Sequence, residues 1–342
     1  MECFDQAIAL RETLLDHLRP WSAYNLAGVW LNRGDTLARM GAHSDVVLRA
    51  YERAAAILGK LEREAPPQFS ARLALAWFNR GTVLSRRPAP ASPTDAVQAF
   101  SESIRIAGAC PDPAAVIRLL PAAGAAMAAA LLRAGDWDQG WAAARRSVAL
   151  AAGFENESSE TAAIGLRCRV VLCELASRGL GSPARARELR EEISIAVDAA
   201  ESGLALAARW PDEPLLAPLA LRLFQSAAES YAVLQPHFLG EFLGEQLTWA
   251  ERSAAGSEFR RAARRSLQAG IAQAARNALA ASMASNLEFN LNILRELRLA
   301  AARLDAGIGD RPDGERGNSA EAAGRNRSDG ESPPETTAHS CI

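Results

Sequence analysis

Two octets of this chain, Trp30-Leu31-Asn32-Arg33-Gly34-Asp35-Thr36-Leu37 and Trp77-Phe78-Asn79-Arg80-Gly81-Thr82-Val83-Leu84, follow one pattern, W-[LF]-N-R-G-x-x-L. Their first residues stand 47 positions apart. A phrase that recurs in fixed register inside a helical pattern is typical of stacked helical repeats, in which each repeat is one supersecondary unit. The octets therefore predict the fold of the chain, but they do not indicate which partner it binds.

Composition favours helix throughout the chain. The 342 residues are 49% hydrophobic but only 6% aromatic, because Ala and Leu supply most of the apolar share. Both are strong helix formers, whereas strands favour β-branched and aromatic residues. We therefore expect an all-α fold. The formal net charge of −2 argues against general binding of polyanions.

The cysteines and the N-terminus indicate a cytoplasmic protein. No two of the five cysteines form a C-x-x-C pair, and an odd, scattered set is typical of free thiols in a reducing compartment. The positions are Cys3, Cys110, Cys168, Cys173 and Cys341. No basic region followed by an apolar run opens the chain, so we expect no signal peptide. The longest apolar run is too short to span a bilayer, and no membrane association is expected.

The region around the first octet resembles the tetratricopeptide repeat (TPR), a helix-turn-helix unit of about 34 residues. That family places a large residue at position four, a small one at position eight and an apolar one at position eleven. Small and aromatic residues follow along its second helix. These places are taken here by Trp30, Gly34, Leu37, Gly41, Val47, Tyr51 and Ala54. Because Gly34 has no side chain, the second helix is expected to lie close against the first, with Trp30 and Tyr51 at its flanks.

The resemblance continues through two more helix pairs. The second pair carries Trp77, Gly81 and Leu84, then Phe100, with a Pro-rich insertion between its helices. The third has Gly124 and Ala128, then the turn Gly135-Asp136-Trp137. Arg33 stands where the family often has Leu, although N-R-G is a common form in bacterial members. The resemblance implies a right-handed α-α superhelix of antiparallel helix pairs.

The rest of the chain divides by composition. We predict an N-terminal capping helix in residues 1–20, three TPR-like pairs in 21–153, and degenerate helical repeats in 154–256. Residues 257–306 are predicted to form C-terminal helices that either continue the superhelix or fold back on it. Residues 307–342 have no hydrophobic period and are predicted to be a disordered tail.

The resemblance also implies a partner-binding site. The sixth position of a TPR first helix points into the concave groove, and an Asn there binds peptide backbone in several members. Asn32 and Asn79 take this position. By helical spacing the same groove would be lined by Leu31, Phe78, Asp35, Thr82, Arg39 and Arg86. The alternative is that N-R-G serves packing and both Asn side chains are solvated. Ala at the matching places of the third pair ends the polar pattern there.

A second candidate is basic. Arg260, Arg261, Arg264 and Arg265 share one helix face and could contact phosphates or an acidic partner. Against nucleic acid stand the net charge and the lack of interleaved aromatics, and a solvated face is the simpler interpretation. The four His are isolated, so we expect no metal and no cofactor. No nucleophile, P-loop or kinase motif is present, and we expect no catalysis.

Together these observations predict a non-catalytic scaffold or adaptor that binds a protein or peptide partner in its groove. Two alternatives stay open: a regulatory subunit or sensor that binds a signal peptide or small ligand, and a nucleic-acid-associated protein that uses the Arg260–Arg265 face. Neither the partner nor a homo-oligomeric state follows from the sequence.

Overall fold

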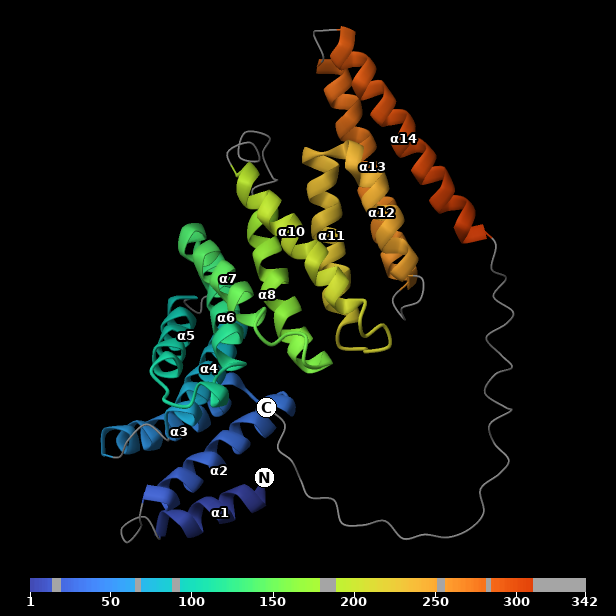
Figure 1. Ribbon diagram of the computed structural model, residues 1–342. Coiled ribbons are helices and arrows are strands. Elements are labelled where there is room, and N and C mark those ends of the chain that lie inside the picture. Colours follow the sequence, from blue (N-terminus) through green and yellow to red (C-terminus); the bar gives the residue numbers. More distant parts are fainter. Residues whose placement is uncertain are drawn as a thin grey trace, which may run out of the picture.

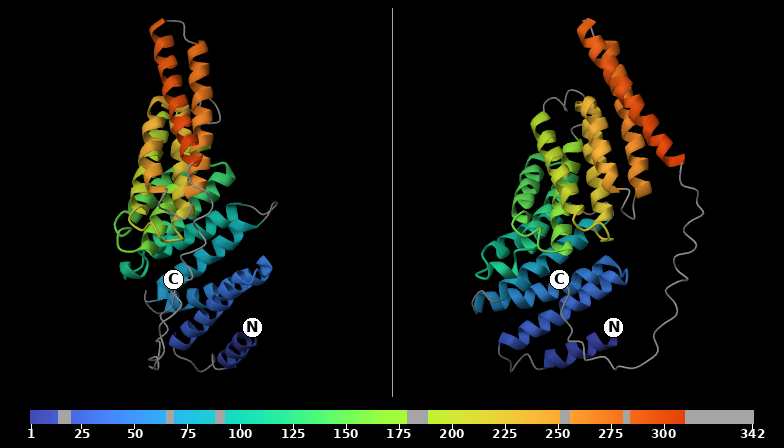
Figure 2. Two further views of the ribbon diagram at one scale, coloured as in Figure 1. Left: turned by 90° about the vertical axis from the view of Figure 1, so that its right-hand side faces the viewer. Right: turned by 45° about the vertical axis from the view of Figure 1, so that its right-hand side comes forward.

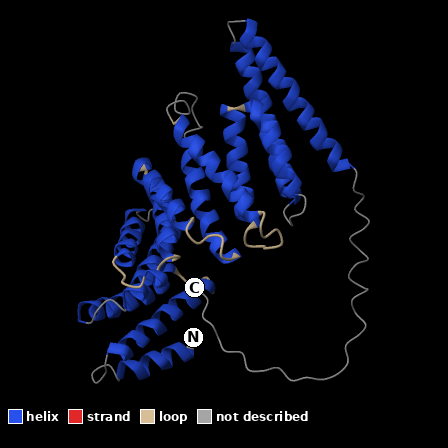
Figure 3. Ribbon diagram, in the orientation of Figure 1, coloured by secondary structure: helices blue, strands red, loops and turns tan. Residues whose placement is uncertain are grey.

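The computed structural model describes residues 1–13, 20–64, 69–87, 93–178, 189–250, 256–280 and 284–309. Within these ranges the chain is helical and contains no strand (Figures 1 and 3). The all-α prediction is therefore confirmed. The predicted tail lies outside the described residues except for its first three positions, 307–309, which belong to the last helix.

Helices make up most of the N-terminal half of the described chain. They are α1 (Glu2–Thr13), α2 (Pro20–Arg39), α3 (Ser44–Glu64), α4 (Ser70–Arg86), α5 (Pro93–Gly108), α6 (Leu119–Ala134) and α7 (Trp137–Ala151). The predicted capping helix extends to residue 20, whereas in the structure Pro20 begins α2. A proline is tolerated in a first turn because the backbone N–H it lacks would have no partner in the helix there.

The helices of the C-terminal half continue the same arrangement. They are α8 (Ser159–Ser177), α10 (Arg190–Ala207), α11 (Ala217–Leu234), α12 (Pro236–Ala250), α13 (Gly256–Ala280) and α14 (Ala284–Gly309). Ser158 begins α8 with a capping box, in which its hydroxyl accepts from the Thr161 N–H and its own N–H donates to the Thr161 hydroxyl.

The pairs stack along the chain. We call α2, α4, α6, α8, α11 and α13 the first helices, and α3, α5, α7, α10, α12 and α14 the second helices. Each first helix packs on its own second helix, and from α4 to α13 each first helix also packs on the next first helix. The views of Figures 1 and 2 show the resulting elongated molecule, with α1 and α2 at one end and α14 at the other. The packing of α11 on α13 and of α12 on α14 extends the stack to the last described helix.

Two glycines in left-handed conformation close the turns of the first and third pairs. Gly41 has φ +70° and Gly135 has φ +84°. In both turns the next residue donates its N–H to the carbonyl four residues before the glycine: Ala42 to Leu37 at 3.0 Å, and Asp136 to Leu131 at 3.0 Å. This is the Schellman motif, which satisfies carbonyls left open at a helix end.

The close approach predicted at the repeated Gly is present in both octets. A Cβ atom at position 34 would lie 2.5 Å from Cε1 of Tyr51, and one at position 81 would lie 2.7 Å from Cε1 of Phe100. Aromatic rings of the second helices therefore rest directly on the backbone of the first helices. This contact sets how closely α3 lies on α2 and α5 on α4.

Candidate partner-binding surface

The two octets have equivalent surroundings. Arg33 lies over the ring of Trp30, 5.4 Å from its centroid, and Arg80 lies over Trp77 at 5.3 Å. Each Arg also reaches back to a carboxylate of the preceding helix. Arg33 pairs with Asp5 of α1 at 3.0 Å, and Arg80 pairs with Glu52 of α3 at 3.4 Å. In both octets the Trp-Arg pair therefore joins one helix pair to the element before it.

This equivalence gives α1 its place in the stack. Asp5 of α1 pairs with Arg33 in the same way as Glu52 of the second helix α3 pairs with Arg80. Helix α1 therefore occupies the position of a second helix before the first pair. Ile8 of α1 is 7% exposed. The helix thus covers an apolar flank of α2, as a terminal repeat of a stack must.

A carboxylate links three helices at the centre of the candidate surface. Oδ1 of Asp35 accepts a hydrogen bond from the Tyr51 hydroxyl at 2.6 Å and another from Nδ2 of Asn79 at 3.1 Å. These contacts tie α2 to α3 and to α4. The donors of Asn79 were expected to face a bound peptide, but one of them is used inside the protein. Asn79 thereby helps to hold neighbouring first helices together.

Charged groups of both octet-bearing helices affect the pKa of the Tyr51 hydroxyl. Burial raises the pKa of the Tyr51 hydroxyl, and the hydrogen bond and negative charge of Asp35 add to the shift. The positive charges of Arg39 and Arg86 act in the opposite direction. Both guanidinium groups are therefore near enough to this hydroxyl to affect its titration, although they come from different repeats.

Polar residues of α2 and α4 form two rows that adjoin at one hydrogen bond. On α2, Asn32, Asp35 and Arg39 follow each other at helical spacing, and Asn79, Thr82 and Arg86 do the same on α4. The bond from Asn79 to Asp35 brings the two rows together. We call these six residues the first-helix face. Asn32, Arg39 and Arg86 are exposed, and the other three are half-buried.

The remaining predicted residues are less accessible. Leu31 is 4% exposed and packs in the core of the first two pairs, so it is no part of the first-helix face. Phe78 is half-buried against Phe100, with ring centroids 5.9 Å apart. The Thr82 hydroxyl donates to the Phe78 carbonyl at 3.0 Å. Side chains at these positions serve packing first, and the polar tips of Asn32, Arg39 and Arg86 extend beyond them.

The basic cluster on α13 is partly neutralised. Arg264 donates to Asp305 of α14 at 2.6 Å, and Arg261 lies 3.9 Å from Glu258. Partial burial raises the pKa of Glu229 on α11, and the charge of Arg265 opposes that shift, which places the guanidinium near that carboxyl. Arg260 is half-buried. Carboxylates of three helices thus accompany the cluster.

One charged pair had no counterpart in the sequence analysis. Arg169 of α8 forms two bonds with Glu155, at 2.5 and 2.8 Å, and the two side chains are only 6% and 9% exposed. Nε of Arg169 donates to Ser202 of α10 at 3.2 Å. The pair fixes the segment between α7 and α8 against the next repeat. The only signal was two helical glycines, Gly165 and Gly203, where a Cβ would collide with Glu155 and Arg169 respectively.

Within the described ranges, no helix is both long and apolar enough to cross a membrane. In the same part of the chain, no three His, Cys, Asp or Glu side chains gather in a way that could hold a metal ion. Cys3, Cys110, Cys168 and Cys173 are free thiols. Cys341 lies outside the described residues.

The sequence matches no known family profile and no curated protein. Among solved structures, the chain is similar to the S. pombe nuclear import adaptor Nro1, with 11% identity, 86% of this chain and 97% of that chain covered, and a TM-score of 0.45. It is also similar to a signal transduction ATPase with numerous domains from Pyrococcus horikoshii that has a tetratricopeptide repeat sensor. There the identity is 14%, the coverage 89% of this chain and 40% of that chain, and the TM-score 0.43.

The stacked helix pairs from α2 to α14 define the class of this protein as a helical repeat protein. At these identities and TM-scores, its function has to be argued from its own residues.

Proposed function

We propose that this chain is a non-catalytic, TPR-like scaffold or adaptor that binds a protein or peptide partner along the first-helix face. The observation that carries the proposal is the Asp35 node, where groups from α2, α3 and α4 meet at one carboxylate. This node fixes two adjacent first helices before any partner arrives. A surface that is ordered in advance lowers the entropy cost of binding, so a short segment can bind with modest contact area.

The chemistry of the face suits a peptide. Asn32 is exposed, and its amide offers both a donor and an acceptor, which is what an extended peptide bond requires. Arg39 and Arg86 lie beyond it on α2 and α4, and they supply positive charge. The half-buried ring of Phe78 on α4 would add apolar contact. Recognition would therefore combine backbone hydrogen bonds with charge-assisted contacts.

Site-directed crosslinking tests this proposal. A photo-crosslinking amino acid is placed at position 32, and a matched one at Gln98, which is exposed on the second helix α5 of the neighbouring pair. We expect a protein partner to crosslink at position 32 and not at position 98. In a competition assay against the wild-type chain, an Asn32→Ala/Arg39→Gln variant should bind only a small part of the partner. Gln98→Ala should bind as much of it as the wild-type chain does. Equal crosslinking from both positions would contradict the proposal.

A further inference from the structure

A row of arginines recurs at one place in successive repeats. Arg39, Arg86 and Arg133 stand 47 residues apart, and Arg178 follows 45 residues later. The first three lie in the last turn of the first helices α2, α4 and α6, and Arg178 is the C-cap of α8. All four are exposed. We call these residues the arginine row.

The helices that carry the row are neighbours. Helix α4 packs on α6, and α6 packs on α8. The hydrogen bond from Asn79 to Asp35 joins α4 to α2, and Arg39 and Arg86 stand at equivalent places on these helices, seven residues after Asn32 and Asn79. Packed helices lie about 10 Å apart. Equivalent side chains at the ends of α4, α6 and α8 therefore recur at about that interval.

The four guanidinium groups are available for binding. Within the ranges that the structure describes, none of them forms an ion pair, and Arg39 donates only to the backbone carbonyl of Asp35, at 3.4 Å. Other arginines near helix ends are paired: Arg87 with Asp45, and Arg105 with Glu102 at 2.6 Å. Four adjacent positive charges without carboxylate partners make a strip of positive potential.

The helix dipole does not explain the row. A cation is favoured at any helix C-terminus, so the second helices would be expected to carry one as well. However, α7 and α10 have no basic residue in their last turns, and neither does the first helix α11. The second helix α5 has Arg105 in its last turn, but this residue pairs with Glu102. The four arginines of the row, by contrast, stand at the ends of the first helices of the first four pairs.

From this geometry we propose that the arginine row binds an extended acidic segment of a partner protein, with the carboxylates of the segment meeting successive guanidinium groups. The inference rests on the proposed function, and it extends the binding surface beyond the first-helix face to α6 and α8. An extended chain rises about 3.3 Å per residue. A carboxylate at every third residue would thus meet successive members of a row whose interval is about 10 Å.

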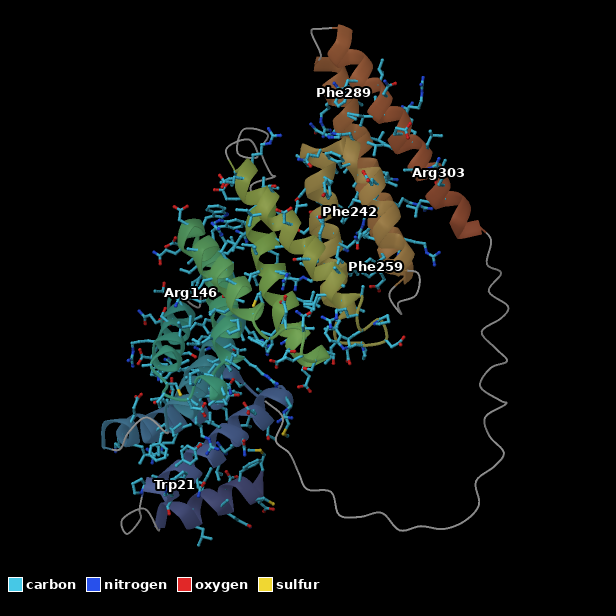
Figure 4. The ribbon with its side chains drawn as sticks, viewed as in Figure 1. Trp21, Arg146, Phe242, Phe259, Phe289 and Arg303 are labelled. Carbon is cyan, nitrogen blue, oxygen red and sulfur yellow. The ribbon has the colours of Figure 1, made fainter. Side chains whose placement is uncertain are left out.

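A protein segment fits better than a nucleic acid. Single strands bind to positive grooves that also offer aromatic rings for base stacking. Among the Trp, Tyr and Phe side chains that the structure describes, the exposed ones are Trp21, Phe238 and Phe289. Trp21 lies in the first turn of α2, at the end opposite Arg39, while Phe238 belongs to α12 and Phe289 to α14. Figure 4 shows Trp21 and Phe289 near the two extremes of the molecule.

Fluorescence anisotropy on the full chain tests the inference. The probes are fluorescein-labelled peptides of four Glu-Gly-Ser or four Gln-Gly-Ser repeats, and an oligothymidylate of similar length. The test variant is Arg39→Gln/Arg86→Gln/Arg133→Gln. The control is Arg49→Gln/Arg145→Gln/Arg146→Gln, which removes the same charge from exposed positions of the second helices α3 and α7. Figure 4 marks Arg146 of the control set.

We expect the acidic peptide to bind the wild-type chain and the neutral peptide to bind it at least about tenfold more weakly. Each exposed charge pair contributes little to the binding free energy, but three of them together account for about a tenfold change in affinity. The test variant should lose about tenfold in affinity, and the control should stay within about twofold. The inference is overturned if both variants weaken equally, if the acidic peptide does not bind, or if the oligothymidylate binds more tightly. If position 32 crosslinks a partner with undiminished yield in an Arg133→Gln/Arg178→Gln variant, whose two changes lie outside the first-helix face, the proposed function stands and only the arginine row is wrong.

Discussion

A methyl group at position 34 would meet the ring of Tyr51, whereas one at position 59 would meet nothing within 4 Å. Both glycines lie inside helices, α2 and α3. We expect Gly34→Ala to destabilise the chain by about 1–3 kcal/mol through overpacking, reduced by its gain in helix propensity. Gly59→Ala should stabilise it by up to about 1 kcal/mol, because only the propensity changes. Urea unfolding of the two variants measures both free energies, and equal signs would contradict the packing argument.

The Tyr51 hydroxyl should make stability depend on alkaline pH. Burial and the contact with Asp35 hold its folded pKa above the unfolded value of about 10. A raised pKa means that this stabilisation is complete below the unfolded pKa and is lost as pH rises above it. We expect the Tm of the wild-type chain to fall more steeply between about pH 9.5 and 11 than that of Tyr51→Phe. Tyr24→Phe, a matched change elsewhere, should keep the wild-type slope.

At the residue scale, the sequence pattern predicted contacts between residues of the same repeat. The spacing of Gly34 and Tyr51 follows from a helix-turn-helix unit, and the structure has that contact. The bond between Asp35 and Asn79 joins residues 44 positions apart in different repeats. Its existence depends on the angle between α2 and α4, which no local pattern contains. The sequence pattern therefore predicted that Asn79 binds a peptide, whereas in the structure its amide donates a hydrogen bond to Asp35.

At the element scale, α8 depends on the buried pair of Glu155 and Arg169. Breaking such a pair leaves an uncompensated buried charge, so Glu155→Ala should cost about 3 kcal/mol. Glu157 lies in the same segment and is exposed. Glu157→Ala should have little effect, and it serves as the control in thermal or urea unfolding.

The thiols of α8 report on the same element. Burial raises the pKa of both Cys168 and Cys173 to about 12, so neither thiol is ionised or accessible near neutral pH. In a chain with Cys3, Cys110 and Cys341 changed to Ser, labelling at pH 8 should require opening of α8. Glu155→Ala should then speed labelling about 100-fold, in line with its loss of stability. Unchanged labelling would show that the pair does not hold this element.

The helices themselves were readable because Ala and Leu dominate the chain, but the neighbours of each charged residue were not. No sequence pattern pointed to Arg169, since its partner Glu155 lies in a connecting segment and Ser202 of α10 adds a further contact. The glycines at 165 and 203 mark the required space. A glycine inside a helix costs about 1 kcal/mol relative to Ala, so such positions indicate where a neighbour approaches closely.

At the scale of the whole molecule, each pair contacts mainly its sequence neighbours, so perturbations should stay local. Helix α1 packs on α2, Asp5 of α1 pairs with Arg33 of α2, and Ile8 of α1 is buried. Removing residues 1–13 should expose the flank of α2 and leave Arg33 without its carboxylate. We expect faster hydrogen exchange in α2 and α3.

The far repeats supply the control for this deletion. Exchange in α8 and α11 should stay at the wild-type rate, because no contact with α1 reaches them among the packed pairs of the stack. A smaller change, Asp5→Asn, should affect α2 in the same direction but less, since an exposed ion pair contributes up to about 1 kcal/mol. Uniform acceleration over all helices would mean that the molecule unfolds as one cooperative unit. In that case the first-helix face would depend on the entire stack rather than on the pairs that carry it.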